Sequence, residues 1–352
     1  MTPPAASHPD TPVPRLHIVT GKGGTGKTTV AGAFALALAG VGHKVLLCEV
    51  EGRQGIASLF DVAPLPYGER RIAVGSDGGE VFALAIDPED ALMEYLDMFY
   101  RLGRAGKALD RFGVIDFATT VAPGVRDVLL IGKVYEATRR GVSTRQRRGG
   151  RHAQTAYDAV VLDAPPTGRI GRFLNVNTEV AGIAKVGPVR NQATSIMRLL
   201  KSDVTSVHVV TSLEEMPVQE SLDAIDELRA IDLHVGTLVV NLQWETELSA
   251  RDLKAAAAGK LDTAEIEKGL KEAGLASDEK VVQGLVAEAG DHAVRVSLER
   301  TQRRRLQAVG LPMVTLPYVS DGVDLGTLYD FADILRSAGV DHVEYGQHGV
   351  RS

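Results

Sequence analysis

The amino-acid sequence predicts an α/β protein with a mostly parallel, doubly wound sheet and helical insertions. Short runs of β-forming residues alternate with segments of helical apolar spacing, which is typical of a parallel sheet covered on both faces. Most of these runs are almost continuously apolar, as expected of strands buried on both faces. The candidate strands are 16–20, 44–50, 81–86, 159–163, 207–211, 237–241 and 313–317.

The segments around these strands set the expected domain organisation. Residues 1–14 are rich in Pro, Ala and Thr, and we expect them to form a disordered lead. Residues 15–340 are expected to form a single domain, with helical insertions at about 88–156 and 248–308. The polar residues 341–352 are expected to form a flexible tail.

Composition narrows the class of protein. The formal net charge of −6 argues against broad nucleic-acid binding, so no nucleic-acid partner is expected. The single cysteine, Cys48, excludes an intrachain disulfide and a thiol cage for a metal within one chain. The N-terminus lacks the apolar block of a signal peptide, and the longest apolar stretch, 30–41, is too short to cross a bilayer. We expect a cytoplasmic protein, with peripheral membrane association as an open alternative.

A glycine-rich motif directly follows the first candidate strand and opens a helix. The motif reads Gly21-Lys22-Gly23-Gly24-Thr25-Gly26-Lys27-Thr28-Thr29. Its glycines let the backbone curl so that N–H groups form a concavity for phosphate oxygens, and the helix N-terminus adds partial positive charge. Lys27 is predicted to bridge the β- and γ-phosphates of ATP, and the Thr28 hydroxyl to ligate Mg²⁺. The motif predicts a P-loop NTPase; the alternative is a chance glycine-rich turn, which the flanking strand and helix disfavour.

Lys22 is a second lysine that the loop does not need to hold a nucleotide in its own subunit. In P-loop proteins with the GKGGxGKT variant, a "signature" lysine at this place reaches across a dimer interface to the phosphates of the partner's nucleotide. The similarity implies that hydrolysis depends on dimer closure. The alternative is a solvated surface lysine.

Asp163 ends the candidate strand 159–163. A carboxylate at the tip of a buried strand beside the phosphate loop is well placed to bind Mg²⁺ through water. The turn that follows is expected to bring the backbone N–H of Gly168 to the γ-phosphate. A simple strand-to-helix turn is the alternative.

Two further strand ends carry polar candidates. Glu51 ends the second candidate strand, where it could orient the attacking water or hold Mg²⁺ through water. Glu49 lies on the same face of that strand, so both carboxylates could line the site, or they could simply be its solvated end. Asn241 ends another strand, where its amide could read the edge of adenine or merely begin a loop.

With these residues the chain resembles the arsenite-pump and tail-anchored-protein-targeting ATPases over residues 15–338. It is most similar to an actinobacterial subgroup of anion-transporting-ATPase-like proteins, which share the stretches Glu-Val-Glu-Gly-Arg-Gln-Gly at 49–55 and Ser-Asp-Gly-Val-Asp-Leu-Gly at 320–326. The resemblance implies a dimer with ATP sites near the interface, a first switch at 51–55 and a second at 163–168. It also implies that Asn241 contacts adenine and that the loop after Pro317 lies near the base.

The sequence departs from the family pattern in three places. The usual first switch has an Asp at the position of Glu51, followed by Pro-Ala-His instead of Gly52-Arg53-Gln54, so Glu51 as catalytic base is a hypothesis. The Cys-x-x-Cys pair that binds zinc and the cysteines that bind arsenite are both absent. We therefore expect neither zinc nor arsenite bound by cysteine. The expected partner is a second ATPase subunit, either a copy of this chain or a paralogue.

Three hypotheses of function follow. The first is an ATPase in which Lys22 closes a two-subunit interface, hydrolysis reopens it, and Lys27, Thr28, Asp163 and Glu51 act at the phosphates. The second is a nucleotide-gated chaperone or adaptor for a membrane-associated or hydrophobic protein, although six methionines are few for a Met-lined groove. The third is a DNA-partitioning ATPase, which the acidic charge balance argues against.

Overall fold

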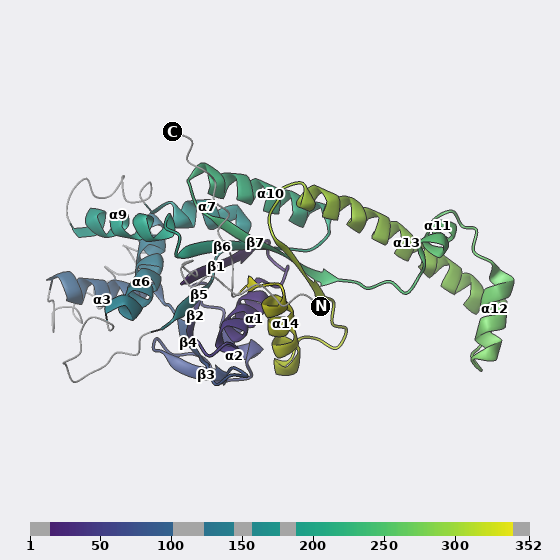
Figure 1. The fold of residues 1–352 in the computed structure, drawn as a ribbon, viewed down its shortest axis with the longest axis horizontal. Coiled ribbons are helices and arrows are strands. Elements are labelled where there is room, and N and C mark those ends of the chain that lie inside the picture. The colour runs from purple at the N-terminus through teal and green to yellow at the C-terminus, as the bar shows by residue number, and fades with distance from the viewer. Residues whose placement is uncertain (1–14, 101–122, 144–156, 177–187, 341–352) are drawn as a thin grey trace, which may run out of the picture.

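An eight-stranded sheet forms the centre of the structure (Figure 1). The computed structural model describes residues 15–100, 123–143, 157–176 and 188–340, and the structural statements below concern these residues. The strands lie in the order β3-β4-β2-β5-β1-β6-β7-β8, and neighbours are parallel except for the antiparallel pair β3 and β4. Their bounds are β1 Leu16–Gly21, β2 Lys44–Glu49, β3 Arg70–Val74, β4 Glu80–Ala85, β5 Ala159–Asp163, β6 Thr205–Thr211, β7 Val235–Gln243 and β8 Met313–Pro317.

The predicted fold class is confirmed, and each of the candidate strands is present. The strand that the sequence pattern misses is β3, which has no fully buried residue within its described span and begins with two exposed arginines, Arg70 and Arg71. Because β3 lies at the edge of the sheet, it lacks the continuous apolar run that marks the central strands. Charged side chains on an edge strand also disfavour pairing with another chain.

Helices cover both faces of the sheet, as Figure 1 shows. On one face lie α1 Lys27–Ala39, α2 Gly55–Leu59 and α14 Leu325–Ser337. On the other lie α3 Pro88–Tyr100, α6 Pro123–Ser143, α7 Thr167–Leu174, α9 Pro188–Leu200 and α10 Glu215–Ala230. Neighbouring residues of β1, Ile18 and Val19, are both fully buried but belong to opposite cores. This two-sided burial explains why the central strands read as unbroken apolar runs.

Both segments predicted as helical insertions contain helices. The first holds α3 and α6, while its remaining residues, 101–122 and 144–156, lie outside the described part of the chain. The second holds α11 Ala250–Ala257, α12 Thr263–Glu272 and the 29-residue α13 Glu279–Gln307. We call residues 249–296, which comprise α11, α12, the turns beside them and the first turns of α13, the helical arm, because they extend away from the sheet in Figure 1.

The expected lead and tail, 1–14 and 341–352, also lie outside the described residues. Within the described part, no helix combines the length and apolar character needed to cross a bilayer.

Candidate nucleotide-binding site

The phosphate loop joins β1 to α1 through a backbone that only glycine adopts without strain. Gly24 and Gly26 have φ angles of 89° and 83°, in the left-handed region. A methyl group added at Gly26 would collide with Nδ2 of Asn241. The loop geometry therefore requires glycine at Gly26 for two reasons, its backbone conformation and its close neighbour.

The N-terminus of α1 is left open for a ligand. Its N-cap is Gly26, no described side chain caps it, and its first turn holds no acidic residue. The buried Lys27 begins the helix, with its side chain only 8% exposed. Backbone N–H groups, helix dipole and ammonium charge together favour an anion at this point.

Thr28 and Asp163 lie together, as the sequence pattern predicts. The Thr28 hydroxyl in the first turn of α1 donates a hydrogen bond to Oδ2 of Asp163 at 2.6 Å. The register pairs Asp163 of β5 with Val19 of β1 and Glu49 of β2, so these strand ends meet at one edge of the sheet. The carboxyl ends of parallel strands are where ligands bind in such sheets.

The charge of Asp163 is poorly compensated by the protein alone. Burial raises the pKa of its carboxyl to about 6, and the nearby charges of Glu49 and Glu51 act in the same direction. The hydrogen bond from Thr28 and the charge of Lys27 oppose this rise. A cation bound beside Asp163 would therefore stabilise the ionised carboxylate and lower its pKa.

Two buried oxygens at the loop have no hydrogen-bond partner among the described residues, Oδ1 of Asp163 and Oδ1 of Asn241. Leaving a buried acceptor without a hydrogen bond costs free energy, and an ion or ligand bound beside these oxygens would remove that cost. Oδ1 of Asp163 is suited to a water bound to Mg²⁺, and Oδ1 of Asn241 to an amino group such as that of adenine. The residues present thus fit both Mg²⁺ and ATP.

Asn241 also has a second contact that its sequence position does not reveal. Its Nδ2 donates a hydrogen bond to the backbone oxygen of Thr25 at 2.9 Å, so β7 braces the phosphate loop. Thr25 itself is held by its hydroxyl, which donates to the backbone oxygen of Lys22 at 2.8 Å. Two hydrogen bonds therefore hold the loop at Thr25, directly before Gly26.

The expectation that Glu49 and Glu51 share one strand face is wrong. The strand ends at Glu49, whose carboxylate accepts hydrogen bonds from the backbone N–H groups of Gly55 at 3.0 Å and Ile56 at 3.4 Å. Glu49 therefore caps α2. Glu51 lies beyond the strand in a bend, with its side chain 19% exposed and 3.9 Å from Nε of Arg53. Glu51 is thus a half-buried carboxylate near Asp163, as its effect on the Asp163 pKa indicates.

Gly168 and Pro317 lie at the ends of their elements. Gly168 is the second residue of α7, which starts without a side-chain cap from the described residues. No described atom would contact a methyl group placed at Gly168, so its backbone is accessible. Pro317 ends β8 and pairs with Gln243 of β7, which is two residues after Asn241. Pro317 therefore lies at the same end of the sheet as Asn241.

Lys22 forms an ion pair with a residue of α10. Its Nζ lies 2.7 Å from Oε1 of Glu220 on α10, and both side chains are about one-third exposed, at 30% and 35%. The helical charge pattern around Glu220 is that of an ordinary solvated face, so no sequence signal marks it as a partner of the loop.

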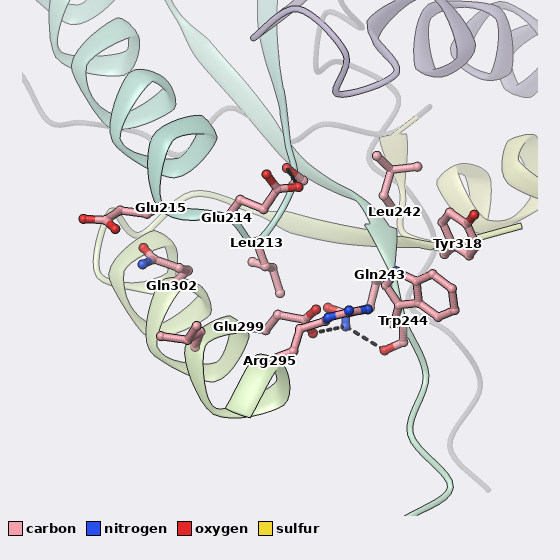
Figure 2. A pocket seen from close by; sticks show the side chains of 12 residues that line it. Leu213, Glu214, Glu215, Leu242, Gln243, Trp244, Arg295, Glu299, Gln302 and Tyr318 are labelled. Carbon is pink, nitrogen blue, oxygen red and sulfur yellow. Dashed lines mark hydrogen bonds between the residues drawn. The ribbon is translucent and has the colours of Figure 1, made fainter. Parts of the chain in front are cut away.

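A cavity of about 460 Å³ opens beyond the ends of β6 and β7, against α13 (Figure 2). Trp244 and Tyr318 stack beside it with ring centroids 4.0 Å apart, and the Arg295 guanidinium lies 5.8 Å from the Trp244 ring. Leu242 adopts a φ angle of 60° where the pairing of β7 with β8 shifts register. The sequence gives no sign of this cavity, because its walls come from four separate segments.

Comparison with known proteins gives a consistent result. A sequence model of the anion-transporting ATPase family matches residues 15–203. ATPase BagA of Mycobacterium tuberculosis is 50% identical over 326 residues, which cover 93% of this chain and 94% of that protein. The arsenical pump-driving ATPase of Escherichia coli is 28% identical over 264 residues, covering 70% of this chain and 42% of that protein. The loop, the strand-end carboxylate and these similarities together show that the chain is an ATPase and belongs to the anion-transporting ATPase family.

Proposed function

We propose that this chain binds Mg²⁺-ATP at the phosphate loop and hydrolyses it in a two-subunit assembly that alternates between open and closed states. The observation that carries the proposal is the pairing of Thr28 with Asp163 beside an uncapped helix N-terminus, with two unpartnered buried oxygens around the same loop. The uncapped N–H groups and the unpartnered oxygens cost free energy in the free protein, and a cation and a polyanion bound together would remove that cost.

Each residue has a distinct proposed task. Lys27 and the loop N–H groups hold the phosphates, while Thr28 and Asp163 hold the metal, directly and through water. Mg²⁺, when bound, supplies positive charge that offsets the charge on the reacting phosphates. Glu51 orients the attacking water, and the backbone N–H of Gly168 donates to the terminal phosphate. Asn241 accepts from the base, with Pro317 beside it.

The two-subunit part of the proposal rests on Lys22. Its ammonium group lies against Glu220, not against the Asp163 carboxylate that accompanies Lys27. Lys22 is also one-third exposed, so it can reach another molecule without unfolding the loop. We propose that it acts on the nucleotide of a second subunit, which is either another copy of this chain or a paralogue.

Substitution of the two lysines tests the proposal. In titration calorimetry with Mg²⁺-ATP, Lys27→Ala is expected to weaken binding at least about 100-fold, because a buried charged hydrogen-bond donor is lost. Lys22→Ala is expected to bind ATP within about threefold of the wild type and to lose at least about tenfold in turnover, since its contact is made only on closure. The exposed Lys260 of the arm gives a matched control, Lys260→Ala, with neither effect. Wild-type turnover in Lys22→Ala would contradict a shared site.

A second candidate function is a nucleotide-gated adaptor with slow turnover that binds a hydrophobic or membrane-associated protein. The exposed apolar side chains at the cavity favour it, with Trp244 44% and Leu298 59% exposed. Photo-crosslinking from position 298, with and without Mg²⁺-ATP, tests this function. Identical partners in the two states would contradict it.

A further inference from the structure

We propose that Glu220 is a positioning residue that holds Lys22 in the open subunit and thereby sets how readily two subunits close. This inference rests on the function proposed above, in which Lys22 acts on the partner's nucleotide. It adds a residue on α10 that neither the phosphate-loop motif nor the two switch segments include.

One carboxylate contacts two parts of the site. Oε1 of Glu220 lies 2.7 Å from Nζ of Lys22 in the phosphate loop. Oε2 accepts a hydrogen bond of 3.4 Å from the hydroxyl of Thr167, the first residue of α7. Thr167 lies within the segment 163–168 that we expect to respond to the terminal phosphate. Glu220 therefore links the loop lysine to the start of that helix.

The carboxylate is carried by a firmly placed helix. The inward side of α10 is buried at residues such as Val218, Ser221 and Leu228. One residue of α7, Gly171, lies so close to the Glu227 side chain that an added methyl group would collide with it. Glu220 and Glu227 are separated by two helical turns and so face α7 together. The tight packing of α7 on α10 fixes the place of Glu220, while Lys22 is in a loop.

When two subunits close, Lys22 must leave the carboxylate of Glu220 to contact a phosphate of the partner's nucleotide. A lysine ammonium group is a compact charge on a flexible stem, and reaching a phosphate of another subunit requires the stem to leave Glu220. The pair is about one-third exposed, so water and salt screen it. Pairs of this kind change an equilibrium constant by a factor of about two to five. Glu220 is therefore a weak restraint, suited to a reversible open state.

The test compares Glu220→Gln with a matched control on the same helix, Asp226→Asn, whose carboxylate is exposed on a different side. Sedimentation with Mg²⁺ and the slowly hydrolysed analogue ATPγS gives the dimer dissociation constant. Turnover of Mg²⁺-ATP is measured against protein concentration. At low salt, Glu220→Gln is expected to lower the dimer dissociation constant about two- to fivefold, and Asp226→Asn to leave it unchanged. At 0.5 M NaCl the gain is expected to vanish, because the pair is then screened.

The double variant separates a direct from an indirect effect. In a Lys22→Ala background, Glu220→Gln is expected to change nothing, since there is no ammonium group left to release. Glu220→Asp retains the charge with a shorter reach and is expected to give a smaller gain in the same direction. This variant keeps the comparison informative should Glu220→Gln lower the melting temperature.

The outcomes distinguish this inference from the function on which it rests. Equal dissociation constants for Glu220→Gln and Asp226→Asn, or a gain that persists without Lys22, would overturn the role of Glu220 while leaving a Lys22-dependent ATPase intact. A wild-type protein that does not bind Mg²⁺-ATP, and does not dimerise in its presence, would overturn both.

Discussion

The phosphate loop and the helical arm treat their helix N-termini in opposite ways. In the arm, Ser249, Asp262 and Asp278 each accept hydrogen bonds from backbone N–H groups of the helix that follows. The helix after the phosphate loop, α1, has no such cap from the described residues. A cap stabilises a helix by about 0.5–2 kcal/mol. The loop forgoes this stabilisation, and a bound anion would restore it.

Burial differs as strongly between the two regions. At the loop, polar side chains are buried: Thr25 is 2%, Asp163 7% and Asn241 3% exposed. In the arm, α12 has no buried residue within its described span, and a small separate core joins α11 to α13. The loop is thus stable as a part of the whole sheet, whereas the arm depends on local contacts. We expect substitutions in the two regions to differ in size and in how far their effects spread.

The largest difference is expected between two glycines that share a left-handed backbone. Gly26 has a φ angle of 83° and contacts Asn241, whereas Gly259 in the arm has a φ angle of 63° and no described atom within 4 Å of an added methyl group. Gly26→Ala is expected to lower the free energy of unfolding by about 2–4 kcal/mol, from backbone strain plus collision. Gly259→Ala is expected to cost about 1 kcal/mol, from backbone strain alone.

Urea denaturation of both variants gives these two values. Equal losses of stability would show that the contact between Gly26 and Asn241 adds nothing to the backbone requirement.

A second comparison concerns the charge of Asp163. Because its pKa in the folded protein is about 6, against a usual value of 3.8, the folded state binds its proton more tightly than the unfolded state. Its contribution to stability is therefore fully present below about pH 4 and is lost as the pH rises through 6. Asp163→Asn removes this loss. Without nucleotide, the free energy of unfolding of the variant, relative to that of the wild type, should therefore rise by about 1–3 kcal/mol between pH 4 and pH 7.5.

The free energy of unfolding, measured at several pH values without Mg²⁺ or nucleotide, checks this prediction. Asp226→Asn, which changes an exposed carboxylate on α10, is the control. A constant difference between the wild type and Asp163→Asn across this pH range would show that the carboxyl titrates in its ordinary range. Binding of Mg²⁺-ATP to the wild type should weaken below about pH 6, because a metal site needs the deprotonated carboxylate.

The difference in burial also decides which strands and contacts could be predicted from the sequence. Buried parallel strands are readable because two-sided burial demands unbroken apolar runs, and β3 was missed because an edge strand lacks that demand. The meeting of Thr28 with Asp163 was predictable since both follow the carboxyl ends of neighbouring strands. The contact of Glu220 with Lys22 was not, because a side chain on a charged helix face carries no pattern that names its partner.

Some local chemistry was also beyond reach of the pattern. Glu49 and Glu51 were predicted to share one strand face, but the strand ends at Glu49 and its carboxylate accepts hydrogen bonds from the backbone N–H groups that begin α2. The bond from Asn241 to the backbone of Thr25 was not predicted either, because it joins residues 216 positions apart in the chain. Tertiary contacts of this kind override local periodicity.

The smallest effect is expected in the core of the arm. Leu253 of α11 is 5% exposed and packs with Ala256, Ala293 and Val296 in a cluster separate from the two sheet cores. Leu253→Ala truncates the largest buried side chain of that cluster, at a local cost of about 1–2 kcal/mol, which is below the usual range because so small a cluster can collapse. Hydrogen exchange is expected to speed up in α11 and the facing turns of α13 and to stay unchanged in α1, since regions with their own small core open independently.

The global free energy of unfolding should change by less than about 0.5 kcal/mol, because sheet and arm share few buried contacts. Faster exchange in α1 as well would show that the arm and the phosphate loop unfold as one unit, and the contrast between the two regions would then be one of exposure without independence.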